Sequence, residues 1–68
     1  MSLKLIINGE ERELETAMSL EALLKDLGIT KGKVAIERNL EIVPRSLYAS
    51  TQVADGDRLE IVHFIGGG

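Results

Sequence analysis

One amphipathic helical segment constrains the fold of this chain more than any other feature. Ser19 can cap an early backbone N–H of the helix, and Gly28 readily adopts the left-handed conformation that ends one. Leucines recur between them at the positions of a single apolar stripe: Leu20, Leu23, Leu24 and Leu27. This stripe must be buried, so the rest of the chain is expected to form a sheet with one face that the helix covers.

The segment before the helix predicts a β-hairpin. Residues 3–7 alternate in the manner of a strand. Asn8-Gly9 follows, and this pair is a strong hairpin signal because both residues tolerate positive φ. Residues 10–15 are highly charged and offer only Leu14 as a core residue, which is typical of an edge strand.

Strand patterns return after the helix. Residues 34–38 and 41–43 predict a second pair of strands. Residues 44–48 begin with proline and predict a turn or one helical turn, and residues 54–57 predict a tight turn. The last run, residues 58–65, alternates as a strand. This order of elements predicts an α+β fold in which one helix covers one face of a small sheet.

The core of such a fold has few residue types to draw on. The chain has 68 residues, no cysteine and two aromatic side chains, Tyr48 and Phe64. Chains of this size usually need disulfides or a metal to support a small core, and this one has no cysteine for either. We therefore expect a single domain with a core built from leucine, isoleucine and valine.

Composition excludes several classes of function. A net charge of −3, with 11 acidic and 8 basic residues, argues against nucleic-acid binding. The absence of cysteine excludes thiolate metal sites and a cysteine nucleophile, and a single histidine, His63, excludes a two-histidine metal site. We therefore expect no metal, and no enzyme, because no nucleophile–base pair is present. No apolar run approaches the roughly 20 residues of a membrane span, and no secretory signal opens the chain. We expect a cytoplasmic protein that is a monomer when free.

Four weaker candidates for a site each have a structural alternative. Asp55 and Asp57 flank a turn glycine, which favours turn chemistry over a weak cation site. The acidic residues 10–15 are typical of a solvated edge, with partner recognition as the alternative. Arg45 is either an anion or acidic-partner ligand or a solvated turn residue. His63 is more typical of a strand than of a catalytic base, because no candidate nucleophile is near it.

The carboxyl end carries the strongest functional signal. The last strand gives way to Gly66, Gly67 and Gly68. A frayed end is the alternative, but fraying gives no reason for glycine alone. Glycine has no Cβ and passes through narrow channels, so we expect a flexible tail, residues 66–68, that enters a partner's active site. The globular domain is expected to span residues 1–65.

Such a tail needs a docking surface beside it. Ordering backbone costs about 1–2 kcal/mol per residue, and glycines make few contacts that offset this cost. We expect Val62 and Phe64, on the outer side of the last strand, to form an apolar docking patch with Ile65. The alternative is that Phe64 folds back into the core.

Taken together, these motifs resemble the ThiS-type sulfur carrier proteins of thiamin biosynthesis. The resemblance covers essentially the whole chain, and the motifs are specific only in combination. They are Ile6-Ile7-Asn8-Gly9, Ser19-Leu20-Glu21-Ala22-Leu23-Leu24, Val34-Ala35-Ile36-Glu37-Arg38-Asn39, Ile42-Val43-Pro44-Arg45, Asp55-Gly56-Asp57 and Gly67-Gly68.

The resemblance implies a ubiquitin-like β-grasp fold, with a small mixed sheet packed on one helix, and a carrier function. A ThiF-type adenylating enzyme would activate the carboxylate of Gly68 with ATP and Mg²⁺, so that no cofactor is bound by the carrier itself. A cysteine desulfurase would supply sulfur as a persulfide, which converts the carboxylate to a thiocarboxylate. A ThiG-type thiazole synthase would accept that sulfur. The chain would thus be a co-substrate of partner enzymes.

Three alternatives stay open. The small subunit of molybdopterin synthase shares the fold and the terminal diglycine, but usually carries prolines where this chain has His63-Phe64-Ile65. A ubiquitin-like modifier for protein lysines or tRNA thiolation is the second. A β-grasp binding module whose glycine end is incidental is the third.

Overall fold

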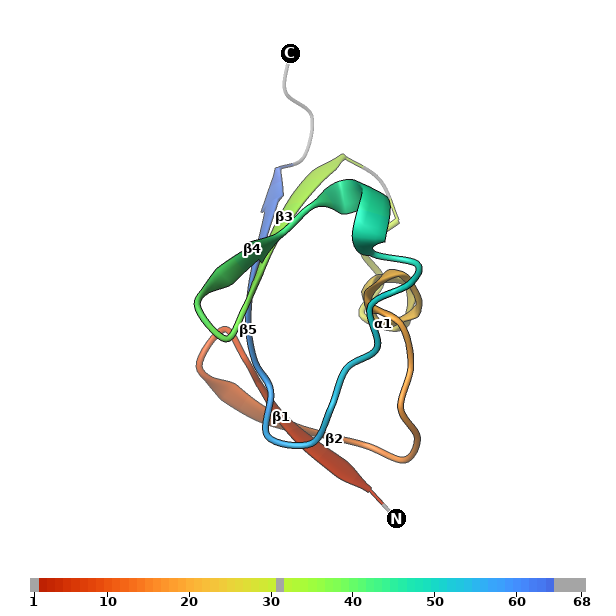
Figure 1. The fold of residues 1–68 in the computed structure, drawn as a ribbon, viewed down its shortest axis with the longest axis vertical. Helices are drawn as coiled ribbons and strands as arrows, with labels where there is room; N and C mark the ends of the chain where they lie inside the picture. The colour runs from red at the N-terminus through yellow and green to blue at the C-terminus, as the bar shows by residue number, and fades with distance from the viewer. Residues whose placement is uncertain (1, 31, 65–68) are drawn as a thin grey trace.

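The computed structural model describes residues 2–30 and 32–64, and in these residues five strands form one sheet against one α-helix (Figure 1). The strands are β1 (Leu3–Ile7), β2 (Glu10–Leu14), β3 (Lys33–Arg38), β4 (Glu41–Val43) and β5 (Arg58–Phe64). The helix α1 spans Leu20–Asp26, and one 3-10 turn, η1, spans Arg45–Leu47. The α+β expectation and the order of elements are confirmed, with ends that differ by one residue in places.

The sheet is mixed, and the first and last strands meet at its centre. The strand order is β2-β1-β5-β3-β4. β1 pairs with β5 in parallel, whereas the other three pairings are antiparallel. The charged strand β2 lies at an edge, as its composition predicted. The mixed sheet packed on one helix is therefore confirmed.

The helix begins and ends at the residues that the sequence marks. The Oγ of Ser19 accepts the N–H of Ala22 at 3.1 Å. At the other end Gly28 has φ +82°, and the N–H of Ile29 donates to the carbonyl of Leu24 at 2.8 Å. This pair of features is a Schellman ending, which satisfies carbonyls that the last turn would otherwise leave without partners.

The core lies between α1 and one face of the sheet. Its buried side chains come from every layer of the fold: Leu5, Ile7, Leu14, Leu20, Leu23, Leu24, Ile36, Tyr48, Val53, Leu59 and Ile61. One member corrects the expectation of a purely aliphatic core. Tyr48 is buried because η1 carries it inward, and its hydroxyl donates to the carbonyl of Val34 at 3.3 Å. A tyrosine is tolerated there because its polar end finds a partner.

Both hairpins turn through two residues with positive φ. Asn8 and Gly9 have φ of 51° and 83°, as predicted. Asn39 and Leu40 have φ of 52° and 72°. Leucine is unusual at such a position, where glycine is preferred because it has no Cβ. Leu40 is also 85% exposed, so burial does not offset the backbone strain.

The turn before β5 is organised by the carboxylate of Asp57, which is only 5% exposed. One oxygen accepts the Nε–H of Arg38 at 2.9 Å and the backbone N–H of Ala54 at 2.8 Å. The other accepts the Nδ2–H of Asn39 at 3.1 Å. Asp57 therefore ties the turn to the β3–β4 hairpin, and the turn-chemistry expectation for this residue is confirmed.

These partners decide the charge state of Asp57. Burial by itself raises the pKa of this carboxyl group, because a charge is poorly solvated away from water. The hydrogen bonds from Arg38, Ala54 and Asn39, with the charge of Arg38, outweigh that effect and hold the pKa below its ordinary value of 3.8. Asp57 is therefore ionised in the folded protein at neutral pH.

Replacing Asp57→Asn is expected to lower the free energy of unfolding at pH 7 by about 2 kcal/mol, because hydrogen bonds to a charged acceptor are lost. Since folding lowers the pKa of Asp57, its contribution is present above 3.8 and disappears as the pH falls through the folded-state value. Urea unfolding at pH 7 and pH 3 measures both effects. The gap between the wild type and the variant should narrow at pH 3, and a gap that is independent of pH would contradict this role.

Candidate functional site

The candidate site is the carboxyl end of β5, where the predicted docking residues lie. Val62 and Phe64 are 50% and 58% exposed and lie on the face of β5 opposite the buried Leu59 and Ile61. The alternative that Phe64 folds into the core is wrong. Ile65, the third predicted docking residue, lies outside the described residues, as do Gly66, Gly67 and Gly68 of the predicted tail.

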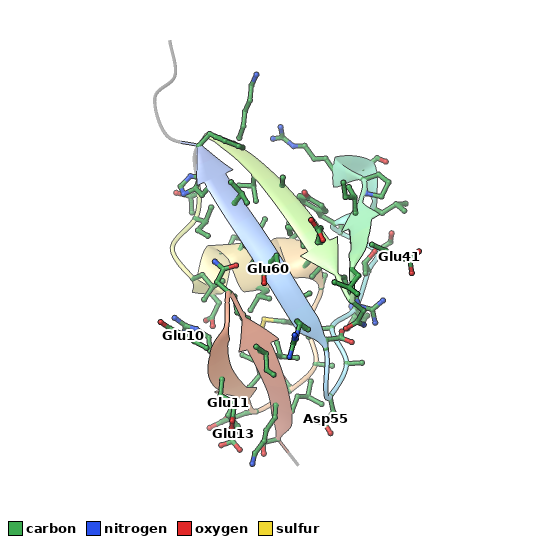
Figure 2. All side chains as sticks on the ribbon, turned by 90° about the vertical axis from the view of Figure 1, so that its left-hand side faces the viewer. Glu10, Glu11, Glu13, Glu41, Asp55 and Glu60 are labelled. Atoms are coloured by element: carbon green, nitrogen blue, oxygen red, sulfur yellow. The ribbon has the colours of Figure 1, made fainter. Side chains whose placement is uncertain are left out.

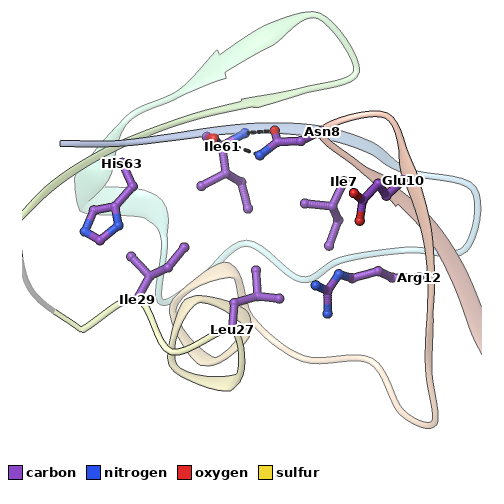
Figure 3. A pocket seen from close by; sticks show the side chains of 8 residues that line it. All are labelled: Ile7, Asn8, Glu10, Arg12, Leu27, Ile29, Ile61 and His63. Atoms are coloured by element: carbon purple, nitrogen blue, oxygen red, sulfur yellow. Dashed lines mark hydrogen bonds between the residues drawn. The ribbon is translucent and has the colours of Figure 1, made fainter. Parts of the chain in front are cut away.

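The side chain of Asn8 holds β5 near this end. The backbone ladder between β1 and β5 runs through the carbonyls of Asp57 and Leu59, which accept the N–H groups of Ile6 and Asn8. The Asn8 amide then continues it: its Nδ2–H donates to the Ile61 carbonyl at 3.0 Å, and its Oδ1 accepts the Ile61 N–H at 2.7 Å (Figure 3). One side chain thus takes the place of a further strand residue.

The carboxyl end of β5 is also held on its β3 side, where two backbone segments approach each other closely. Gly32 precedes β3 with φ +87°, and a Cβ at this position would overlap the carbonyl oxygen of Phe64. A Cβ would also meet the Nε2 of His63 at 3.2 Å. Only glycine permits this contact without a shift of β5. Sequence reasoning missed both Gly32 and the Asn8 clasp, because hairpin chemistry already accounted for Asn8 and no local signal marks Gly32.

The helix-side face of this region contains a groove of about 300 Å³ (Figure 3). Aliphatic side chains line it, among them Leu27, Ile29 and Ile61. Arg12 lies at one end and the half-buried His63 at the other. His63 is therefore a strand residue beside this groove, and no serine, threonine or lysine of residues 2–30 and 32–64 lines it.

The remaining sequence candidates are structural or exposed. The Oδ1 of Asp55 accepts the N–H of Lys4 at 2.7 Å, which supports turn chemistry at this residue as well. Arg45 and the acidic side chains of residues 10–13 are exposed. Across residues 2–30 and 32–64, no group of three acidic, histidine or cysteine side chains is arranged to hold a metal ion. The helix of this described part is also too short and polar to cross a membrane.

The end of β5 is held on both sides and exposes apolar side chains. β5 is held by the Asn8 side chain on one side and by six register pairs with β3 on the other. Its last described residues present apolar side chains outward.

Comparison with known proteins identifies the family. The ThiS family model matches residues 5–68. The sulfur carrier protein ThiS of Bacillus subtilis is 38% identical over 50 residues, which cover 74% of this chain and 76% of that protein. The crystal structure of the thiamine biosynthesis protein ThiS from Geobacter metallireducens superposes with a TM-score of 0.81 at 30% identity, covering 97% of this chain and all of that one. The ubiquitin-like β-grasp fold expected from the resemblance is thereby confirmed.

Other relatives are much longer proteins. A thiazole synthase of Paramagnetospirillum magneticum is 64% identical over 66 residues, which are 97% of this chain. A thiazole synthase of Magnetococcus marinus is 44% identical over the same length. This chain spans only 20% of the length of each of these two proteins.

The Asn8 clasp can be tested with a substitution that keeps the turn. Asn8→Gly retains a residue suited to positive φ but removes two hydrogen bonds to Ile61, so we expect the free energy of unfolding to fall by about 1–3 kcal/mol. Leu40→Gly is the matched control: it also places glycine in a two-residue turn, but it removes strain and should not destabilise the domain. Urea unfolding measures the difference. Equal effects of the two substitutions would show that the clasp contributes nothing.

Proposed function

The chain belongs to the ThiS family of sulfur carrier proteins in thiamin biosynthesis, and on this basis we propose that it carries sulfur as a thiocarboxylate on Gly68. The family match includes this residue. In this proposal Gly68 provides a free terminal carboxylate, and the chain is a co-substrate of partner enzymes.

Activation of that carboxylate requires another protein. An α-carboxyl group has a pKa of about 3.3–3.7, so it is an anion at neutral pH and a poor electrophile. A ThiF-type enzyme would join it to the α-phosphate of ATP with Mg²⁺, releasing pyrophosphate and forming an acyl-adenylate. The described residues supply binding surface for this step and no catalytic group.

Sulfur then replaces one oxygen. The terminal sulfur of a cysteine desulfurase persulfide would attack the acyl carbon, and AMP would leave with one of the original oxygens. A thiol reductant would supply the electron pair that breaks the remaining S–S bond and frees the thiocarboxylate. The absence of cysteine from this chain is compatible with the scheme, because the sulfur is held on the main chain.

A thiazole synthase is the proposed acceptor of the sulfur. Two relatives named thiazole synthase contain a segment similar to 97% of this chain within a longer polypeptide. The presence of both segments in one natural polypeptide supports a functional association between them.

The single observation that carries the proposed carrier function is the match to the ThiS family over residues 5–68.

Intact mass tests the carrier function. Incubation with ATP, Mg²⁺, the adenylating enzyme and a persulfide donor should raise the mass by that of sulfur minus that of oxygen. Methionine oxidation gives nearly the same gain, but both methionines lie at or before residue 18. The carboxyl-terminal fragment must therefore carry the change, and deletion of Gly68 must abolish it. An unchanged mass, with the enzymes shown active on another carrier, would refute the proposal.

The docking role of Phe64 has its own test. Phe64→Ala removes an exposed side chain, so the free energy of unfolding should change by no more than about 0.5 kcal/mol. Activation by the adenylating enzyme should fall about tenfold, the scale of losing an aromatic contact at an interface. Leu47→Ala, at an exposed leucine on η1, is the matched control and should activate normally. Normal activation of Phe64→Ala would remove this residue from the docking surface.

A further inference from the structure

The face of the sheet opposite α1 is uncovered in the described part of the chain, and strand register defines its composition (Figure 2). Val62 lies opposite Ala35 across β5 and β3. One row below, Glu60 of β5 lies opposite Glu37 of β3, and Glu37 in turn lies opposite Ile42 of β4. All five side chains therefore share one face.

The apolar members of this face are more extensive than the sequence predicted. Ile42 is 76% exposed, although it is a large aliphatic side chain on a strand. With Val62 and Phe64 it forms an exposed apolar surface across β5, β3 and β4. A hollow of about 70 Å³ lies in this surface, and its lining includes Ala35, Ile42 and Val62 together with both glutamates.

Glu37 and Glu60 stand out within this apolar surface. Two like charges directly opposite one another in antiparallel strands destabilise a sheet. Neither carboxylate forms an ion pair within residues 2–30 and 32–64. Arg58, two residues before Glu60 on the same side of β5, makes no ion pair with it either. The free domain thus keeps two carboxylates opposite each other, and neither has an ion-pair partner among the described residues.

We propose that this face docks the thiazole synthase, and that a lysine or arginine of the synthase inserts between Glu37 and Glu60. This inference rests on the proposed carrier function. The hollow suits such a side chain because its aliphatic stem can pack on Ile42 and Val62 while its charged end meets both carboxylates. We expect the partner's surface around that side chain to be apolar, so that it complements the exposed apolar side chains of this face.

Two arguments favour the thiazole synthase over a second copy of this chain or another enzyme as the protein that docks on this face. A second copy of the chain, placed face to face, would bring four carboxylates together and is therefore disfavoured. The thiazole synthase is preferred among enzymes because relatives of that name contain a domain similar to this chain. A domain that is joined to its partner in one polypeptide is expected to have a surface complementary to it.

The test compares two pairs of neutral substitutions on the same side of the sheet. The double variant Glu37→Gln, Glu60→Gln should weaken binding to the cognate thiazole synthase about tenfold or more, because the basic side chain of the partner would be left without its counter-charges. The control Glu11→Gln, Glu13→Gln makes the same change of net charge on the edge strand β2 and should alter the dissociation constant less than about twofold. Titration calorimetry with the purified wild-type chain and synthase measures both. Added salt should weaken the wild-type complex more than that of the Glu37, Glu60 variant.

A second measurement excludes unfolding as the cause of weaker binding. Removing the like-charge pair should leave the thermal midpoint of the free Glu37, Glu60 variant equal to or above that of the wild type. Loss of binding by a protein of equal or greater stability is the expected result. A lower midpoint would overturn the like-charge part of the argument.

Several outcomes would overturn the docking proposal. These are no binding of the wild-type chain to the synthase, equal weakening by the control pair, or unchanged affinity of the Glu37, Glu60 variant. Weakening seen only toward the adenylating enzyme, or wild-type self-association that the variant abolishes, would assign the face to another occupant. If the wild-type chain still acquires sulfur on Gly68 in these cases, only the docking proposal fails. If it acquires none, the carrier function itself fails.

Discussion

The parallel pairing of β1 with β5 is the contact on which the rest of the structure depends. It joins the two ends of the chain across the centre of the sheet, yet only two register pairs define it. Such a non-local contact is costly to form, because it closes a loop that contains every other element. Side chains compensate for its shortness. Asn8 extends the ladder to Ile61, and Asp57 anchors the turn from which β5 begins. These two polar side chains therefore help to fix the position of β5.

The two faces of the sheet differ in burial and composition. One face meets α1 and supplies the core, where burial of leucine and isoleucine accounts for the stability of a chain without disulfides. The other face keeps Ile42, Val62 and Phe64 exposed, and it places Glu37 opposite Glu60 with no ion pair to either among residues 2–30 and 32–64. A sheet selected for stability alone would place polar residues and opposite charges there. Local arrangements that lower stability are common where a protein binds others, since the partner supplies what the free domain lacks.

The sequence predicts local features of this fold well and non-local ones poorly. The helix with Ser19 and Gly28 at its ends, and the Asn8-Gly9 turn, follow from residues within a few positions of each other. The clasp between Asn8 and Ile61 joins residues 53 positions apart, and no local pattern encodes it. The burial of Tyr48 and the carboxylate network of Asp57 were missed for the same reason. At the candidate site, alternation along one strand predicted that Val62 and Phe64 face outward. Ile42 was missed because its membership of the same face depends on how β4 pairs with β3.

Under the proposed function the chain would bind several enzymes in turn, and this requirement bears on how its surface is built. A purely apolar face would bind each partner only by burying apolar surface. Such binding would give slow release and little discrimination between partners. Charges at the centre of the face change both properties. They speed the encounter with a basic partner and disfavour an acidic one, while the cost of removing them from water limits the affinity. Glu60 lies two residues from Val62 and four from Phe64 along β5, and Glu37 lies opposite Glu60 on β3, so both effects would act on the proposed contact. The arrangement is therefore compatible with the proposed carrier function, in which the chain would bind each partner, transfer sulfur and dissociate.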